Sequence, residues 1–338
     1  MIKHVVSCST GKDSVATLLL AIENCPRENI IPIFCDTGNE HEVVYQHLTY
    51  LEQALDITIV RLKADFTEQI ANKRNFIARD QRKGRKYDTI KVPLGGIDEN
   101  GKELFRLKKV GGGRRIRWSN KAKRRALAVL HPTGNPFLDL CLWKGRFPSR
   151  KAQFCTEELK RNMAVEFQLS LVDQGFQVLS WQGVRRDESE SRKNAKKSER
   201  IGGGIWTFRP IVEWTALDTF AFAKARGIQP NPLYTAGMGR VGCMPCINAR
   251  KDELLQISKR FPEHIQRIAK WESLVAQAGK RGVSPFFAAP KMTNREASKQ
   301  TIGVVVEWSK TTRGGKQYDL LGDLAEPTAC ASSYGLCE

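Results

Sequence analysis

The first sixty residues alternate between short apolar runs and longer amphipathic segments. Apolar residues fill 2–6, 30–35 and 57–62, and each run has the length of a buried strand. Between the runs, residues 15–22 and 43–55 place apolar side chains at helical spacing. Strands and helices that alternate in this way indicate βαβ units. We therefore expect an α/β fold with a doubly wound, mainly parallel sheet and helices on both faces.

The alternation is interrupted at about 72–135 and resumes afterwards. Expected elements in the later part are a helix from a Thr156 cap to about Asp173, a strand over 177–181, helices over about 217–225, 252–260 and 263–278, and a strand-like run over 304–308. We expect one domain over 1–260 that carries a basic insertion at 72–135. A helical and irregular C-terminal extension over 261–338 follows it.

Positive charge is concentrated in the insertion. The chain has a formal net charge of +19, and residues 73–125 contain 19 Lys and Arg against 5 Asp and Glu. Clustered basic residues with glycine and an aromatic side chain are typical of contacts with phosphates and bases. We expect DNA or RNA to bind here, with Arg114, Arg115, Arg117 and Trp118 as contacts. A solvated basic loop without a specific partner is the alternative.

The lengths of the apolar runs and the number of cysteines indicate the cellular compartment in which the protein works. No apolar run approaches the roughly 20 residues that a membrane span requires, and the N-terminus lacks a signal-peptide pattern. We therefore expect a cytoplasmic protein without a membrane partner. The nine cysteines favour metal or thiol chemistry over disulfides in a reducing compartment.

The first strand ends in a loop of small polar residues, Ser7-Cys8-Ser9-Thr10-Gly11-Lys12-Asp13-Ser14, directly before a helix. A helix N-terminus offers unpaired N–H groups and the positive end of its dipole, which suits a phosphate. The loop is shorter than the Walker pattern, and no G-x-G-x-x-G is present. On this pattern alone, an anion site and a merely capped turn are equally favoured.

Two further polar segments also follow expected strands, namely 36–40 and 183–192. Because ligands of parallel sheets bind at the carboxyl ends of strands, these segments and the first loop are expected to line one crevice.

The pair Cys243-Met-Pro-Cys246 can present two thiolates to one metal. A redox dithiol is the alternative, although the pair does not stand at the first βα junction. Cys155 lies at an expected helix N-terminus, which favours a thiolate. Zinc and iron–sulfur cannot be separated by spacing. Further candidate ligands are Cys141, Cys330 and Cys337, whereas Cys8, Cys25 and Cys35 are expected to be packing residues.

Taken together, the ordered motifs resemble the phosphoadenosine-phosphosulfate reductase-like family of the adenine-nucleotide α-hydrolase (PP-loop) superfamily. Residues 9–14 are similar to its S-G-G-K-D-S loop, with Thr10 in place of the first glycine. Residues 183–192 are similar to its G-x-R-x-x-E-S-x-x-R element, and residues 147–160 and 231–246 also look like family segments. The resemblance covers about 1–66 and 136–260.

The resemblance implies the roles of the site residues. Lys12, Asp13 and Arg185 would be catalytic, and the adenine nucleotide would contact Ser7, Ser9, Thr10, Gly11, Ser14, Asp36, Gly183 and Arg192, with Asp36 near Mg²⁺. Iron–sulfur members take cluster ligands from a cysteine pair before a helix and from a later C-x-x-C. Here Phe154 replaces one member of the pair. The expected ligands are thus Cys155, Cys243 and Cys246, with Cys141, Cys330 or Cys337 as the fourth.

Two reactions compete within this family. Lys12-Asp13 resembles the ATP-splitting members, in which Lys and Mg²⁺ stabilise the departing pyrophosphate. We therefore expect ATP to activate a nucleic-acid group for sulfur transfer, with a [4Fe–4S] cluster (or zinc) and, by family analogy, a cysteine desulfurase as sulfur donor. The alternatives are a phosphoadenylyl- or adenylyl-sulfate reductase that uses Cys337, and a non-catalytic nucleotide-sensing nucleic-acid-binding protein.

Overall fold

The computed structural model describes residues 1–99, 101–288, 292–312, 332, 334 and 336. Its main sheet has the strand order β3-β2-β1-β6-β8-β7, and all neighbours are parallel except the edge pair β7–β8. The strands are β1 (Ile2–Ser7), β2 (Ile30–Asp36), β3 (Val60–Lys63), β6 (Gln177–Trp181), β7 (Ser198–Gly202) and β8 (Ile205–Phe208). The expected mainly parallel sheet is confirmed.

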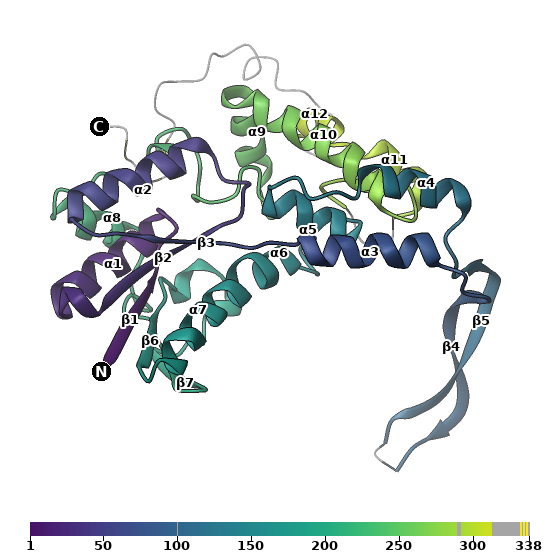
Figure 1. Ribbon diagram of the computed structural model, residues 1–338, viewed down its shortest axis with the longest axis horizontal. Coiled ribbons are helices and arrows are strands. Elements are labelled where there is room, and N and C mark those ends of the chain that lie inside the picture. Colours follow the sequence, from purple (N-terminus) through teal and green to yellow (C-terminus); the bar gives the residue numbers. More distant parts are fainter. Residues whose placement is uncertain (100, 289–291, 313–331, 333, 335, 337–338) are drawn as a thin grey trace.

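Helices cover both faces of this sheet (Figure 1). Successive residues of a strand point to opposite faces, so Val6 and Phe34 pack on one side while Val5 and Ile33 pack on the other. The first side is covered by α1 (Lys12–Asn24), α2 (Glu42–Leu55) and α8 (Ala216–Lys224), and the second by α7 (Asn162–Asp173). Burial on both faces explains why β1 and β2 read as continuous apolar runs.

A second core joins the insertion to the C-terminal extension. Ile77 and Ala126 of the insertion pack in the same buried cluster as Ile268 and Val275 of the extension. Its helices are α3 (Thr67–Arg79), α4 (Asn120–Val129), α5 (Pro136–Lys144), α9 (Lys251–Arg260), α10 (Pro262–Ala278) and α12 (Ile302–Ser309), and two short helices are α6 (Phe154–Thr156) and α11 (Asn294–Lys299). Most of the insertion is therefore ordered structure. The expected domain boundary at residue 260 stays a prediction.

Two local expectations are wrong. Residues 304–308 belong to helix α12 and not to a strand, because Ile302 and Val306, one helical turn apart, both enter the second core. Thr156 does not cap a helix: helical structure already begins at Phe154, and no side-chain cap bond is present.

Strands β4 (Arg85–Ile97) and β5 (Glu103–Arg115) form an antiparallel hairpin that projects from the body, here called the arm (Figure 1). Its apolar side chains, such as Leu94 and Leu107, are exposed. Arg114, on β5, pairs with Asp88 across the hairpin at 2.9 Å.

The base of the arm is fastened by Asp80. Its carboxylate accepts hydrogen bonds from Arg82 Nε and from the backbone N–H of Trp118, both at 2.8 Å. The ring of Trp118 is 7% exposed and lies in the second core. Trp118 therefore closes the base of the arm against the body, and its expected contact with nucleic acid stays a prediction.

Replacement of Asp80 by asparagine is expected to lower the free energy of unfolding by roughly 1–3 kcal/mol at pH 7, because charge-assisted hydrogen bonds are lost from a buried group. The bond from Arg82 in particular holds the pKa of Asp80 well below its usual range. A lowered folded-state pKa stabilises the fold above the unfolded pKa of about 3.9 and loses that effect as the pH falls. Urea unfolding at pH 7 and at lower pH checks both points.

The control for this experiment is Asp173→Asn, at the exposed end of α7. Equal unfolding free energies for Asp80→Asn and wild type at pH 7 would contradict the anchoring role.

Candidate nucleotide site and cysteine group

Strand order creates a switch point between β1 and β6. The chain leaves β1 towards β2 on one side and leaves β6 towards β8 on the other, which is where ligands of open parallel sheets bind. The loop 8–14 and the segment 183–192 meet there. A Cβ atom on Gly183 would lie 2.7 Å from the carbonyl oxygen of Asp13, so only glycine allows this approach.

The first loop is held by a distant segment. Thr10 has a φ of 60°, a left-handed conformation that costs a residue with a side chain about 1–2 kcal/mol. Its buried hydroxyl accepts a hydrogen bond from Asn231 Nδ2 at 3.1 Å. The hydroxyl of Tyr234 accepts from the N–H of Lys12 at 2.9 Å. These contacts explain how threonine occupies a position at which the family motif has glycine.

Hydroxyl groups line the turn between Gly11 and helix α1. Gly11 is the N-cap of α1, and Ser14 Oγ donates to its carbonyl oxygen at 2.9 Å. Ser14 Oγ in turn accepts a hydrogen bond from the N–H of Ser9 at 3.0 Å. Ser7 is the last residue of β1. The predicted nucleotide contacts of the first loop are therefore brought together at one helix N-terminus.

Positive charge surrounds the first turn of α1. The side chain of Lys12 is 7% exposed, and its Nζ lies 3.7 Å from Asp13 and 4.9 Å from the ring centre of Tyr334. Arg185 is buried and pairs with Asp13 and with Asp187. These groups come from three separate segments of the chain.

A further guanidinium group, that of Arg192, lies within electrostatic reach of both Arg185 and Arg240. Burial, together with the like charges of Arg240 and Arg185, lowers the pKa of Arg192. Arg192 is also paired with Glu188. Guanidinium groups that gather at a helix N-terminus suit a phosphate or sulfate group.

Asp36 lies at the same edge of the sheet but is turned towards α2. Its Oδ1 accepts from Gly38 N at 2.9 Å and from the hydroxyl of Tyr45 at 2.7 Å. Within the described residues it has no hydrogen bond or ion pair to the loop 8–14. Its expected role near Mg²⁺ stays a prediction.

The C-x-x-C segment is tied to the residues after β2. Cys243 pairs with Glu40 as an isolated antiparallel bridge, and the hydroxyl of Thr37 lies 3.4 Å from Cys243 Sγ. Cys246 Sγ accepts a hydrogen bond from Arg240 at 3.1 Å. Arg240 thus connects the C-x-x-C segment to the arginines of the nucleotide site.

The four described candidate ligands form one electrostatically connected group. A charge on Cys155 raises the pKa of Cys141, and Cys246 acts in the same way on Cys155 and Cys243, in each case after the larger effect of burial. Lys160 faces the same group, and the charge of Cys243 raises its pKa. Burial raises the pKa of the Cys155 thiol, the opposite direction to the effect expected from a helix N-terminus. Cys330 and Cys337 lie outside the described residues.

The distances between these thiols are relevant to the kind of metal that they could bind. Zn–S bonds of about 2.3 Å in a tetrahedron place thiolates roughly 3.8 Å apart. In the described part of the chain, the group of three side chains close enough for one ion is His41, Glu263 and His264, and it contains no cysteine. Among the described residues, no three of these thiols are gathered that closely, so both the zinc and the iron–sulfur expectation stay predictions.

A family model described as "Phosphoadenosine phosphosulfate reductase domain" matches residues 3–249. The chain belongs to this family. A phage relative, "Uncharacterized 37.8 kDa protein in gpa 5'region" of Escherichia phage 186, is 44% identical over 350 residues, which cover 99% of this chain and 96% of that protein.

Similarity to enzymes of the family is shorter. The adenosine 5'-phosphosulfate reductase of Burkholderia cepacia is 35% identical over 68 residues, or 20% of this chain and 27% of that protein. The same enzyme of Streptomyces coelicolor is 39% identical over 68 residues, 19% and 28% of the two chains. A crystal structure of phosphoadenylyl-sulfate reductase from Candida auris, a phosphate complex, aligns with a TM-score of 0.39 and 14% identity over 72% of this chain and 82% of that one. No helix among the described residues is long and apolar enough to cross a membrane.

Some contacts of the site escaped the sequence interpretation. Tyr234, Arg240 and Lys160 stand within the motifs quoted for the family, but their side-chain roles depend on contacts with distant segments. Arg114, Arg115 and Arg117 lie in or next to the arm, and Figure 1 places the arm and α1 at opposite ends of the molecule. The structure therefore does not bring the arm to the nucleotide loop.

Replacement of Gly183 by alanine is expected to weaken adenine-nucleotide binding at least tenfold, because the new methyl group would push segment 183–192 away from α1. Gly239→Ala is the matched control, since a Cβ there meets nothing within 4 Å. Isothermal titration with ATP and a thermal melt of both variants check the prediction. Unchanged affinity in Gly183→Ala would show that the contact does not shape the site.

Proposed function

We propose that this chain binds ATP on the loop 8–14 and splits it between the α- and β-phosphates. The observation that carries the proposal is the nearly buried ammonium group of Lys12 at the first turn of α1, beside the buried Arg185. The N-terminus of α1 and these cations provide fixed positive charge at one point. Such preorganised charge stabilises a departing anion more effectively than water does.

In the proposed reaction a nucleophile of the acceptor attacks the α-phosphorus of ATP. The bond from this phosphorus to the bridging oxygen breaks, pyrophosphate leaves with the electron pair, and the acceptor carries an adenylyl group. Lys12 would stabilise the leaving pyrophosphate, while Arg185 and Arg192 would hold the α-phosphate. When bound, Mg²⁺ would neutralise further phosphate charge, and Asp36 is the proposed ligand.

The acceptor in this proposal is a nucleic acid, which the adenylyl group activates for sulfur transfer or a related modification. The support is charge: the arm and its flanks, with Arg114, Arg115 and Arg117, carry much of the net charge of +19. A cysteine desulfurase is the proposed sulfur donor. Cys155, Cys243, Cys246 and Cys141 would hold a [4Fe–4S] cluster, which supplies redox-active iron next to the nucleotide site.

One contact favours a second candidate, a sulfonucleotide reductase. Tyr334 of the C-terminal segment donates a hydrogen bond to Gly239 O at 2.7 Å, and its ring lies next to Lys12. Cys337 follows three residues later in the sequence. A thiol-dependent reductase requires a thiol that reaches the nucleotide, and Cys337 is the proposed one. In that reaction the thiol sulfur would attack the sulfonate sulfur and release the nucleotide.

Product analysis separates the candidates. The anaerobically purified protein is incubated with ATP, adenylyl sulfate or phosphoadenylyl sulfate, with a dithiol and with or without single-stranded nucleic acid. Pyrophosphate release from ATP supports the first candidate. Sulfite release that is lost in Cys337→Ser supports the reductase. Nucleotide binding without either product supports the non-catalytic sensor.

A further inference from the structure

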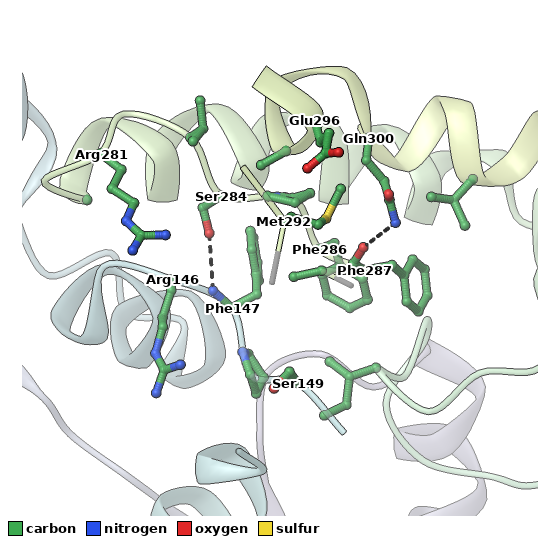
Figure 2. A pocket seen from close by; sticks show the side chains of 18 of the residues that line it. Arg146, Phe147, Ser149, Arg281, Ser284, Phe286, Phe287, Met292, Glu296 and Gln300 are labelled. Carbon is green, nitrogen blue, oxygen red and sulfur yellow. Dashed lines mark hydrogen bonds between the residues drawn. The ribbon is translucent and has the colours of Figure 1, made fainter. Parts of the chain in front are cut away.

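A large cavity lies outside the nucleotide loop, between the loop 143–151 and the C-terminal helices. Its volume is about 1750 Å³. Figure 2 shows the loop on one wall, with Arg146, Phe147 and Ser149, and Arg281, Ser284, Met292, Glu296 and Gln300 on the other.

The lining is strongly basic. Its one acidic residue among those described is Glu296, against ten basic residues: Lys73, Lys144, Arg146, Arg150, Lys151, Arg250, Lys251, Lys280, Arg281 and Lys299. Within the described residues, Lys144 alone among these ten has a carboxylate at ion-pair distance, namely Glu158 at 2.7 Å. Lys73 and Lys280 donate to backbone carbonyl oxygens, which leaves their charges uncompensated. The cavity therefore has a high positive potential.

Aromatic side chains form the floor and one side. Phe147 and Phe286 are buried and in edge-to-face contact at 5.2 Å. Trp308 is 46% exposed and Phe287 is partly exposed, whereas the ring of Trp143 stacks on Phe66 and has Lys144 Nζ 3.6 Å from its centre. Partly open rings next to unpaired cations are the combination on which unstacked bases bind, with phosphates on the cations.

We propose that this cavity binds an unpaired stretch of nucleic acid, with its bases on the open aromatic rings and its phosphates on Arg146, Arg281 and neighbouring cations. The cavity exceeds the roughly 300–1000 Å³ of a small-molecule site, so it has room for more than one nucleotide. A concave, aromatic-lined site accepts bases only when they are unpaired, which distinguishes this site from the projecting arm.

The cavity is linked to the candidate nucleotide site through the C-x-x-C segment. Ile247 lines the cavity directly after Cys246, which is hydrogen-bonded to Arg240. The inference deepens the proposed function, because it assigns the acceptor strand to this site. Binding itself requires no reaction and is measured without ATP.

The test measures fluorescence anisotropy of labelled twelve-residue single strands of DNA and RNA, and of the corresponding duplexes, over a range of salt concentrations. The double variant Arg146→Glu/Arg281→Glu is compared with Arg200→Glu/Lys224→Glu, which makes the same charge change at exposed residues of β7 and α8. A third double variant, Arg106→Glu/Lys108→Glu, places the change on the arm.

The expected result is tighter binding of single strands than of duplexes. In Arg146→Glu/Arg281→Glu, the slope of log affinity against log salt should fall by about 1.4, or about 0.7 for each lost phosphate contact. The control should keep the wild-type slope. Trp308→Ala should weaken single-strand binding roughly 5- to 100-fold through lost stacking, without changing the slope. The comparison of DNA with RNA strands identifies which nucleic acid the cavity prefers.

Three results would overturn the proposal: equal affinity for duplex and single strand, a slope change confined to the arm variant, or a change of sedimentation coefficient in Arg146→Glu/Arg281→Glu with unchanged binding. The last would place a second copy of the chain on the cavity. Pyrophosphate release is measured separately. Single-strand binding without pyrophosphate release would support the cavity as a nucleic-acid site and contradict the proposed reaction. Pyrophosphate release without single-strand binding would contradict only the nucleic-acid site.

Discussion

Replacement of Lys12 by alanine is expected to reduce pyrophosphate release from ATP by roughly 10²–10³-fold, the typical effect of removing one preorganised charge or donor from a transition state. The reason is the position of this side chain. Its Nζ is held at the first turn of α1 by Asp13 and by the rings of Tyr234 and Tyr334, so its charge needs no rearrangement when pyrophosphate departs.

The experiment for Lys12 uses ATP labelled on the γ-phosphate and separates pyrophosphate from phosphate. Lys12→Met keeps the aliphatic contacts with the tyrosine rings and removes only the charge, so it should lose as much activity as alanine. Lys63→Ala, at the exposed end of β3, is the control for loss of a lysine at the same edge of the sheet. Equal turnover in wild type and Lys12→Met would remove Lys12 from the reaction.

Replacement of Cys243 by serine is expected to remove most of the iron and acid-labile sulfide from anaerobically purified protein. A protein that lacks one of the thiolate ligands binds an iron–sulfur cluster much more weakly. Cys243 is bridged to Glu40 and interacts electrostatically with Cys246. Iron and sulfide analysis, together with the visible absorption spectrum, measures the effect. Cys155→Ser and Cys246→Ser should behave in the same way.

The control for the cysteine experiment is Cys25→Ser, since Cys25 lies beside His4, apart from the group. Parallel variants Cys141→Ala, Cys330→Ser and Cys337→Ser identify the fourth ligand as the one whose removal also lowers the iron content. Stoichiometric zinc without iron in the wild type would contradict the cluster. Equal iron content in Cys243→Ser and wild type would show that this residue is not a ligand.

The central strands could be predicted from the sequence because burial on both faces leaves a continuous apolar run. The expected runs at 2–6, 30–35 and 177–181 correspond to β1, β2 and β6 within one residue at each end. The start of α1 was also visible, since the small residues of the loop separate two apolar patterns. At these positions the local sequence pattern and the burial in the folded protein favour the same secondary structure.

The insertion and the extension were harder to predict because they fold on each other. The run Val304–Trp308 suits a strand by composition, yet Ile302 and Val306 find their apolar partners in a core built by α3, α4 and α10. A short apolar run does not reveal its partners. The burial of Trp118 was not visible for the same reason: in the sequence it lies within a basic segment, and Asp80, 38 residues earlier, fixes its backbone.

For the candidate site, the sequence predicted which loops share an edge but not which side chains meet. Strand ends place 8–14 and 183–192 together in any sheet of this order. The contact between Lys12 and Tyr234 joins residues 222 positions apart, and Arg240 meets Cys246 only because of the turn between them. Contacts of this kind depend on the packed structure and not on spacing.

The two ends of the arm lie side by side on the body. Ile116 N donates to Gly84 O at 3.3 Å, and no described residue of 85–115 belongs to a buried core cluster. The arm is therefore a segment that evolution can exchange without disturbing the buried cores. A recombination event that replaces 85–115 by a short turn, or by a different hairpin, leaves both cores intact and costs little loop-closure entropy. Under the proposed role of the arm, exchange of this hairpin would change the nucleic-acid preference between related chains and leave the proposed nucleotide site unchanged.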